Sequence, residues 1–436
     1  MSIFASLFFL GGLVGVWELG VTTGSHLVSN VVASYFLVWG IIWSFSKQSR
    51  GELIGRFVLI TASSCAAVGS LEALSFAGLV DYREIFRTSN APGWLLPHNE
   101  FDPELLVVRK PYAQASGKRI PNIAKQYCVP ARTYEYDLRY DRNGFRNARD
   151  ISQADIAVVG DSYIEGAQIS DDALIATSVL QRYMSTRVAN LGRSGYGPQQ
   201  ELAVLKRYAI PLRPKVIVWA FYEGNDLKDI HEYEKIIAKI ESNRGSHGST
   251  VDRSFLNNSL RVIWELVFKP CKADLSARSG EFEKQDGNVV RVLFMDQRGM
   301  TLTIRDLLAL DRLRDIFAEA HRVTAQHGVT LVVAFLPTKF RVYEGATRIP
   351  ENSTLPAASD DLPQRIRNML ADTAPDIGFV DLTTVFAERV RHGQSVFLED
   401  DTHWTELGHQ VAAQTLGNYL QHEGNAMTRS EHRSVP

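Results

Sequence analysis

The chain has 436 residues, enough for two or three ordinary domains, and its 47 Lys and Arg against 49 Asp and Glu leave a formal net charge of −2. This balance argues against a nucleic-acid-binding protein, which normally carries a clear basic excess. Three cysteines, at positions 65, 128 and 271, are too few for a disulfide-rich miniprotein and lack the CxxC spacing of a zinc or redox site. The averages conceal two unlike regions, because only nine charged residues lie within residues 1–85.

This N-terminal region contains three apolar stretches, at residues 3–21, 27–46 and 57–80. Each is close to the ~20 residues that a helix needs to cross the hydrocarbon layer of a membrane. The absence of a basic segment before the first stretch argues against a cleaved signal peptide. We therefore predict that residues 1–85 form an anchor of three transmembrane helices.

The basic residues indicate which way the anchor points. Lys47, Arg50 and Arg56 lie between the second and third stretches, whereas residues 22–26 contain no Lys or Arg. Positive loops stay in the cytoplasm, so the N-terminus is expected there too. This predicts a multi-pass protein of the inner cell membrane, with everything after about residue 81 on the periplasmic or extracellular side.

Two features of this topology leave alternatives open. Glu18 and Glu72 lie within the stretches, where a carboxylate either reaches the interface or lines an ion pathway, and the interfacial interpretation is favoured. Cys128 and Cys271 share the oxidising side, where they could form a disulfide or remain buried thiols.

The outer region begins with an irregular connecting segment and continues as an α/β domain. Residues 86–150 hold six of the sixteen prolines and show little periodicity. From residue 151 to 422, short continuous apolar runs alternate with helical stretches, which is typical of a parallel sheet covered on both faces. The five predicted strands are residues 156–159, 188–191, 216–221, 330–336 and 378–380.

Three further segments have predicted roles. A long amphipathic helix is expected at about residues 305–326. Residues 228–300 are too long for one crossover and are interpreted as an insertion near the active face, a lid or specificity element. The polar residues 423–436 are expected to form a disordered tail.

Four polar motifs lie at or near the ends of predicted strands. The first is Gly160-Asp161-Ser162-Tyr163, where a small residue before a serine at a strand-to-helix turn can expose a nucleophile. Ser162 could equally be an ordinary helix N-cap. The second motif, residues 190–197, is rich in glycine, so that the Gly195 backbone N–H could act as an oxyanion donor.

The other two motifs supply an amide and an imidazole. Asn225, in Glu223-Gly224-Asn225-Asp226, could present its side-chain NH₂ to an oxyanion, although alone it would suit a turn. His403 follows Asp400 and Asp401, and an acid at that spacing can orient an imidazole toward a serine. Together the motifs provide a nucleophile, two oxyanion donors and an oriented base, which is the inventory of an acyl-transfer site.

These motifs resemble the four blocks of the SGNH/GDSL hydrolase superfamily, which is named for Ser, Gly, Asn and His. The resemblance covers about residues 140–422 and implies a flavodoxin-like three-layer fold with a parallel five-stranded sheet. It implies that Ser162 is the nucleophile, that His403 is the base, and that the Ser162 N–H, Gly195 N–H and Asn225 side chain form the oxyanion hole.

The partner of the histidine is ambiguous. The common family spacing Asp-x-x-His selects Asp400. The string Asp401-Thr402-His403-Trp404 also resembles the Asp-x-His-Trp dyad of SGNH-like alginate acetylation proteins, and this selects Asp401. The match of the whole tetrapeptide favours Asp401.

The leading hypothesis is a membrane-anchored serine esterase or O-acyltransferase that acts on an ester or acetylated glycan of the envelope or an exopolysaccharide. The covalent route needs no metal or organic cofactor. The expected partners are the lipid bilayer, the glycan and other envelope polysaccharide-assembly proteins, and no nucleic acid. The alternatives are a catalytically silent glycan-binding or assembly module and, less favoured, a transporter built on the three spans.

Tyr163, Tyr196, Tyr222 and Trp404 flank the motifs. They could stack on sugars, but packing in the core is the favoured interpretation.

Overall fold

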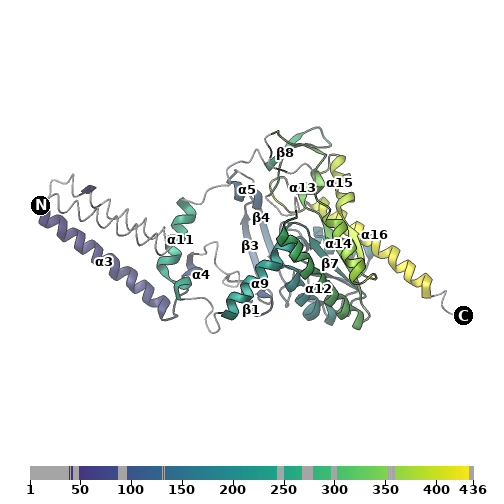
Figure 1. The fold of residues 1–436 in the computed structure, drawn as a ribbon, viewed down its shortest axis with the longest axis horizontal. Helices are drawn as coiled ribbons and strands as arrows, with labels where there is room; N and C mark the ends of the chain where they lie inside the picture. Colours follow the sequence, from purple (N-terminus) through teal and green to yellow (C-terminus); the bar gives the residue numbers. More distant parts are fainter. Residues whose placement is uncertain are drawn as a thin grey trace. The chain divides into compact units, whose positions relative to one another are not determined.

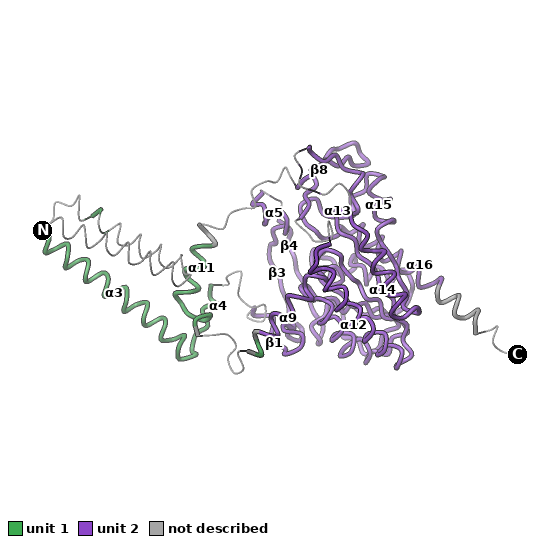
Figure 2. The backbone as a smooth tube through the Cα atoms, in the orientation of Figure 1, with its two compact units in different colours: residues 1–95, 240–270 green, residues 96–239, 271–436 purple. Residues whose placement is uncertain are grey.

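The computed structural model describes residues 39, 41–42, 49–86, 96–129, 131, 133–242, 250–267, 278–295, 302–351, 353, 355 and 359–431. The chain divides into two compact units, coloured separately in Figure 2. The first unit comprises residues 1–95 and 240–270, and the second comprises residues 96–239 and 271–436. The predicted insertion at residues 228–300 therefore contributes to both units.

The first unit contains a long apolar helix, α3 (Arg50–Phe76), which begins after the N-cap Ser49. Its most apolar window has a mean hydropathy of 1.7 and is not buried, and within the described residues it alone is long and apolar enough to cross a bilayer. It begins earlier than the predicted third span, so that Arg50 and Arg56 lie in the helix and not in a loop. The first two predicted spans fall outside the described residues, apart from positions 39, 41 and 42. Three transmembrane helices are thus not confirmed.

Part of the predicted lid belongs to this first unit. The short helices α4 (Tyr82–Phe86) and α10 (Thr250–Arg253), and the longer α11 (Phe255–Val267), all contact one another or α3. Residues 250–267 therefore pack with the apolar helix, and their interpretation as a lid or specificity element stays a prediction.

The connecting segment, predicted to be irregular, contains regular structure. Strands β1 (Asn99–Asp102) and β2 (Leu106–Arg109) pair antiparallel, as do β3 (Gln114–Arg119) and β4 (Tyr134–Arg139), with α5 (Asn122–Tyr127) between the latter two. Each strand is only four to six residues long, so none gives a sustained signal, although Tyr134, Tyr136 and Leu138 of β4 alternate with polar residues. Cys128 is disulfide-bonded and Cys65 is a free thiol, while Cys271 lies outside the described residues.

The second unit is built on the five predicted strands. They are β5 (Ile156–Gly160), β6 (Val188–Gly192), β7 (Val216–Tyr222), β10 (Thr330–Leu336) and β12 (Gly378–Asp381). The spatial order is β12-β10-β7-β5-β6, and all neighbours are parallel. This is the flavodoxin-type order, in which the first strand lies between the second and the third. The predicted α/β class and five-stranded sheet are confirmed.

Helices cover both faces of this sheet (Figure 1). Alternate residues of each strand face opposite sides: Trp219 and Phe221 of β7 join one core cluster, and Val218 and Ala220 join the other. The first cluster includes α8 (Pro198–Val204), α12 (Ile304–Gln326) and α14 (Leu362–Thr373), and the second includes α7 (Ala176–Met184), α15 (Thr383–Arg391) and α16 (Glu406–Glu431). Helix α16 continues to Glu431, so the predicted disordered tail from residue 423 is helical over most of its length.

Shorter elements complete the second unit. A small sheet has the order β11 (Thr347–Arg348), β8 (Ser279–Glu283) and β9 (Val289–Leu293). The remaining helices are α6 (Ser162–Glu165), α9 (Asp226–Ser242), α13 (Lys339–Tyr343) and the short turns Asp172–Leu174, Leu205–Ala209 and Ile210–Leu212.

Candidate active site

The nucleophile motif forms a tight turn from β5 into α6. Asp161 caps the helix by accepting a hydrogen bond from the Tyr163 N–H at 2.9 Å, so Ser162 is the first helical residue and is not itself the cap. Gly160 is required by packing, because a Cβ there would lie 2.7 Å from Ile164 and 2.9 Å from Ala220. The turn thus places the Ser162 hydroxyl at the carboxyl edge of the sheet, beside the strand-order reversal where such sheets bind ligands.

Ser162, His403 and Asp401 form a connected chain of hydrogen bonds. His403 Nε2 lies 2.8 Å from Ser162 Oγ, and His403 Nδ1 lies 2.6 Å from Asp401 Oδ1. A carboxylate partner requires Nδ1 to carry the proton, which leaves the Nε2 lone pair free to accept the serine proton. Asp400 contacts Tyr134 Oη at 3.2 Å instead, so the geometry favours Asp401 as the partner of the imidazole.

Asp401 is only 1% exposed, yet it is held as the anion. Burial by itself would raise its pKa, but the hydrogen bond and charge of His403 and the Asn122 N–H outweigh burial and lower the pKa below the usual range. An ionised Asp401 can stabilise the imidazolium that forms when His403 takes a proton.

A supporting layer of polar residues surrounds Asp401, and the sequence analysis did not find it. The Asn122 backbone N–H donates to Asp401 Oδ2 at 2.7 Å, and its side chain exchanges two hydrogen bonds with Thr402. Gln168 Nε2 lies 3.4 Å from Asp401 Oδ1, and the guanidinium of Arg119 donates to Gln168 Oε1 at 2.5 Å. Asn122 and Arg119 come from the segment predicted to be irregular, which gave no sequence signal for this role.

Lys339 holds the loop that carries Asp401 and His403. Its fully buried ammonium donates to the backbone carbonyls of Leu398, Glu399 and Asp401 at 2.5, 2.8 and 3.1 Å. Burial lowers its pKa to about 7, against the opposing effect of the nearby carboxylates. Lys339 lies three residues after the end of β10, and its role had no distinctive signal in the sequence.

A second buried network fixes the glycine-rich loop. Glu165 accepts hydrogen bonds from the Ser194 N–H at 2.6 Å, from the Ser194 hydroxyl, from Arg109 Nη2 at 2.9 Å and from the Tyr140 hydroxyl at 2.7 Å. Burial would raise the pKa of Glu165, but the charges of Arg109 and Arg193 outweigh burial and lower it. The adjacent Gly195 has φ +81°, a left-handed conformation that glycine adopts without strain.

Gly195 and Asn225 follow β6 and β7, the two strands that flank β5. Because the strands are parallel, their carboxyl ends lie at one edge, together with Ser162. Asn225 Nδ2 donates to Asp229 Oδ2 at 2.7 Å, and Asn225 Oδ1 is buried without a hydrogen-bond partner among the described residues. The structure thus brings the serine, histidine and Asp401 into direct contact and places the two predicted oxyanion donors on the neighbouring strand ends.

Several buried carboxyl groups lie near Asn225. Burial raises the pKa of Asp161 to about 6 and that of Asp229 to about 7. Burial also raises the pKa of Glu201 and of Asp226, and repulsion by the neighbouring carboxylates adds to the effect. Within the described residues, no group of three or more His, Cys, Asp or Glu is arranged to hold a metal ion. Burial and mutual repulsion both favour the protonated forms of these acids.

The aromatic residues around the motifs belong to the core. Tyr163, Tyr196, Tyr222 and Trp404 are all less than 5% exposed. Tyr163 packs edge to face against Trp404 and donates to the Thr402 carbonyl at 2.5 Å. The favoured packing interpretation is correct for these four rings.

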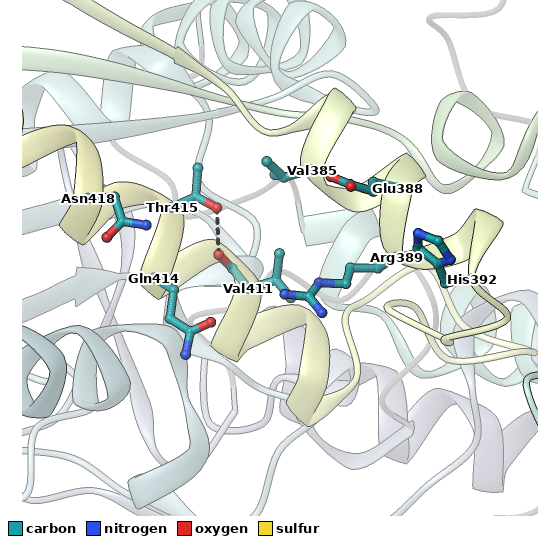
Figure 3. Close-up of a pocket in the computed structure, with 8 residues that line it drawn as sticks. All are labelled: Val385, Glu388, Arg389, His392, Val411, Gln414, Thr415 and Asn418. Atoms are coloured by element: carbon teal, nitrogen blue, oxygen red, sulfur yellow. Dashed lines mark hydrogen bonds between the residues drawn. The ribbon is translucent and has the colours of Figure 1, made fainter.

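A groove elsewhere on the second unit is distinct from this site. It has a volume of about 400 Å³ and lies between α15 and α16, lined by Glu388, Arg389, His392, Gln414 and Asn418 among others (Figure 3). None of its lining residues belongs to the Ser162-His403-Asp401 chain, so the groove is separate from the candidate active site.

The fold and the Ser-His-Asp contact define a hydrolase-like α/β domain, and comparison with known proteins agrees. Residues 293–435 match the family model described as SGNH hydrolase-like domain, acetyltransferase AlgX. The resemblance to the SGNH/GDSL superfamily is thereby confirmed.

Two curated relatives match a shorter stretch. The chain is 37% identical over 103 residues to a protein of Azotobacter vinelandii and 34% identical over 98 residues to one of Pseudomonas putida, both named "Probable alginate O-acetylase AlgJ". Each match covers 22% of this chain and 24% of the relative, so the chain spans about a quarter of the length of these relatives.

Among the solved structures with a similar fold is a member of the lipolytic protein G-D-S-L family from Veillonella parvula. It has 12% sequence identity and a TM-score of 0.32, and the match covers 60% of this chain and 94% of that one. Another is the acetyl xylan esterase AlAXEase, with 9% identity, a TM-score of 0.32, and coverage of 61% and 98%.

Proposed function

We propose that this protein is a membrane-anchored serine acyl-transfer enzyme that moves acetyl groups onto or off an envelope or exported polysaccharide. The observation that carries the proposal is the 2.8 Å contact between His403 Nε2 and Ser162 Oγ, with Asp401 on the other imidazole nitrogen. The two relatives named as alginate O-acetylases support a polysaccharide as the substrate.

In the first half of the reaction, Ser162 Oγ attacks the ester carbonyl while His403 Nε2 takes the hydroxyl proton. The charge that develops on the carbonyl oxygen is stabilised by the Ser162 and Gly195 N–H groups and the Asn225 amide. The bond to the leaving alcohol then breaks, His403 returns the proton to that alcohol, and an acetyl group remains on Ser162.

In the second half, an acceptor hydroxyl gives its proton to His403 and attacks the acetyl carbon. The bond to Ser162 breaks and the serine recovers its proton from His403. With water as acceptor the enzyme is an esterase, and with a sugar hydroxyl it is an O-acetyltransferase. The same residues serve both outcomes, because only the access of water to the acetyl-enzyme differs.

The apolar, unburied surface of α3 supports a membrane anchor. In the proposed topology, the second unit is periplasmic or extracellular, where an exported glycan is accessible. The disulfide at Cys128 suits that oxidising location.

The test is a pair of serine variants of the full chain in detergent. Ser162→Ala should abolish both p-nitrophenyl acetate turnover and labelling by a fluorophosphonate. The control is Ser170→Ala, at an exposed serine eight residues further along the chain, and this variant should retain both activities. Both variants should show unchanged circular dichroism. Adding a deacetylated polysaccharide should divert acetyl groups from water to the glycan if transfer is the natural outcome.

Undiminished turnover in Ser162→Ala would exclude the covalent mechanism. If the unmodified protein shows neither turnover nor a fluorophosphonate adduct, the alternative of a silent glycan-binding module would replace the proposal.

A further inference from the structure

The side-chain amide of Asn225 can serve as an oxyanion donor in only one of its two orientations. A half-turn of the amide group exchanges Nδ2 with Oδ1, and both orientations fill nearly the same space. The NH₂ group stabilises a negative oxygen, whereas the carbonyl oxygen repels it. The value of Asn225 to the proposed chemistry therefore depends on what fixes the orientation of this amide.

Asp229 distinguishes between the two orientations. Asn225 Nδ2 donates to Asp229 Oδ2 at 2.7 Å. An ionised carboxylate has acceptors only, so it binds the NH₂ group and repels the carbonyl oxygen. Asn225 Oδ1 is buried and has no hydrogen-bond partner among the described residues, so no hydrogen bond on the carbonyl side of the amide contributes to its orientation.

The backbone holds Asp229 in place relative to Asn225. Helix α9 begins directly after Asn225, and the Asp229 N–H donates to the backbone carbonyl of Asn225 at 2.8 Å. The two residues are thus one helical turn apart and are joined by a backbone and a side-chain hydrogen bond. A Cβ at Gly197 would lie 2.6 Å from the Asp229 Cβ. The glycine at the end of the second motif therefore allows that loop to pack directly on Asp229.

Asn225 also approaches the turn that carries the nucleophile. Burial raises the pKa of Asp161, and the hydrogen bonds of the Tyr163 N–H and the Asn225 side chain are among the contacts that oppose this effect. Asp161 directly precedes Ser162. The Asn225 amide is therefore in contact both with Asp229 and with the turn that presents the Ser162 hydroxyl.

We propose that Asp229 is a positioning residue for acyl transfer, which accepts one N–H of the Asn225 amide so that the amide nitrogen, and not the carbonyl oxygen, faces the developing oxyanion. This inference rests on the proposed function, in which Asn225 contributes to the oxyanion hole. Within the described part of the chain, the Asp229 carboxylate hydrogen-bonds to the Asn225 amide alone, so no other donor competes for it.

A purely structural role for Asp229 predicts a different result. An acid in the first turn of a helix interacts favourably with the helix dipole, and Asp229 lies in the first turn of α9. Such a role affects stability and does not depend on the Asn225 side chain. A positioning role acts through that side chain, so the effect of replacing Asp229 on kcat should vanish once the Asn225 amide has been removed.

The experiment is a double-mutant cycle on the full chain in detergent, with p-nitrophenyl acetate at pH 8.5. This pH lies above the value of about 7 to which burial raises the pKa of Asp229, so the carboxylate is ionised. One cycle combines Asn225→Ala with Asp229→Leu, and a second uses Asp229→Ala, so that the result does not depend on how a leucine fits. Asp229→Asn is the conservative variant, and Asp372→Leu, at an exposed position of α14, is the control. Circular dichroism and tryptophan fluorescence establish that each variant is folded.

Asn225→Ala should lower kcat by about a hundredfold, as the loss of an oxyanion donor does. Asp229→Leu and Asp229→Ala should lower kcat by about tenfold with little change in KM, and by less than about twofold when residue 225 is already alanine. Asp229→Asn should keep kcat within about threefold of the unmodified protein, because its amide oxygen still accepts the N–H. Asp372→Leu should leave kcat unchanged.

An unchanged kcat in both Asp229→Leu and Asp229→Ala would overturn the inference, as would an equal loss with and without the Asn225 amide. A normal kcat in Asn225→Ala would also overturn it and would leave the covalent mechanism intact, because Ser162→Ala tests that mechanism separately. If the unmodified protein neither cleaves the ester nor reacts with a fluorophosphonate at Ser162, the proposed function and the inference are both wrong.

Discussion

Asn122 and Asp401 are 279 residues apart in sequence, yet the backbone N–H of Asn122 donates to the Asp401 carboxylate at 2.7 Å. The Asn122 side chain adds a donor to Thr402 Oγ1 at 2.6 Å and an acceptor for the Thr402 N–H at 3.0 Å. The first turn of α5 therefore fixes the loop that carries the proposed acid and base. Such supporting contacts hold catalytic groups within the narrow limits that proton transfer requires.

Replacing Asn122 by Ala should lower kcat for p-nitrophenyl acetate by about tenfold, with little change in KM. The variant keeps the backbone hydrogen bond to Asp401 but loses both contacts to Thr402, so the imidazole is held less firmly. Asn368→Ala is the matched control, because Asn368 is exposed on α14 and, within the described residues, its side chain hydrogen-bonds only to Gln364. Equal kcat values in the two variants would show that the α5 contact has no role in catalysis.

The residues of the four motifs could be predicted from the sequence, whereas the residues that hold these motifs in place could not. The five strands were found because continuous apolar runs are the direct consequence of burial on both faces of a parallel sheet. Ser162, Gly195, Asn225 and His403 were found because each follows or lies near a strand end and has a chemically distinctive type. Two spacings were possible for the acid; the tetrapeptide match favoured Asp401, and the contact of His403 with Asp401 favours the same residue.

The supporting residues could not be predicted in the same way. Strand β3 reads Gln-Ala-Ser-Gly-Lys-Arg, and its pairing with β4 involves backbone groups that any sequence could supply. Asn122 and Arg119 act through partners far away in sequence, and no local pattern encodes such contacts. The position of α11 was missed for a related reason, since amphipathicity is the same for a lid and for a helix that packs on α3.

Replacing Glu165 by Gln should lower the free energy of unfolding by about 3 kcal/mol, because Arg109 and Arg193 would remain buried without their counter-charge. Glu165 is fully buried, and its ion pair with Arg109 measures 2.9 Å. The control is Asp155→Asn, which breaks the half-exposed pair with Arg187 and should cost less than about 1 kcal/mol. Urea unfolding followed by tryptophan fluorescence measures both variants. Equal losses would mean that the buried network contributes no more than a surface pair.

The buried acids should make stability fall as the pH rises. Burial raises the pKa of Asp229 to about 7, whereas in the unfolded chain the same group loses its proton near pH 4. Between these values the folded protein holds more protons than the unfolded chain, so the contribution of this group to the free energy of unfolding decreases with increasing pH.

Asp229→Asn should therefore reduce the difference in unfolding free energy between pH 5 and pH 8 by about 2 kcal/mol, because the amide resembles the protonated acid at both values. The Asn225 amide can still donate to the new side-chain oxygen. Asp372→Asn, at an exposed position of α14, is the control and should leave the difference unchanged. Parallel pH profiles for Asp229→Asn and the unmodified protein would show that Asp229 is ionised in the folded state throughout this range.

Gly195 and Gly328 allow the conformational and chemical roles of a glycine to be separated. Both have positive φ, +81° and +65°, and an added Cβ would meet no atom within 4 Å at either position. Alanine at each site should therefore cost about 1 kcal/mol of stability from backbone strain alone. Gly328 ends α12, whereas the Gly195 N–H is a proposed oxyanion donor, and a small displacement of that donor should lower kcat by at least about tenfold. Thermal unfolding and p-nitrophenyl acetate turnover of Gly195→Ala and Gly328→Ala would be measured together. If the two variants lose similar stability and both retain full turnover, the Gly195 N–H is not part of the oxyanion hole.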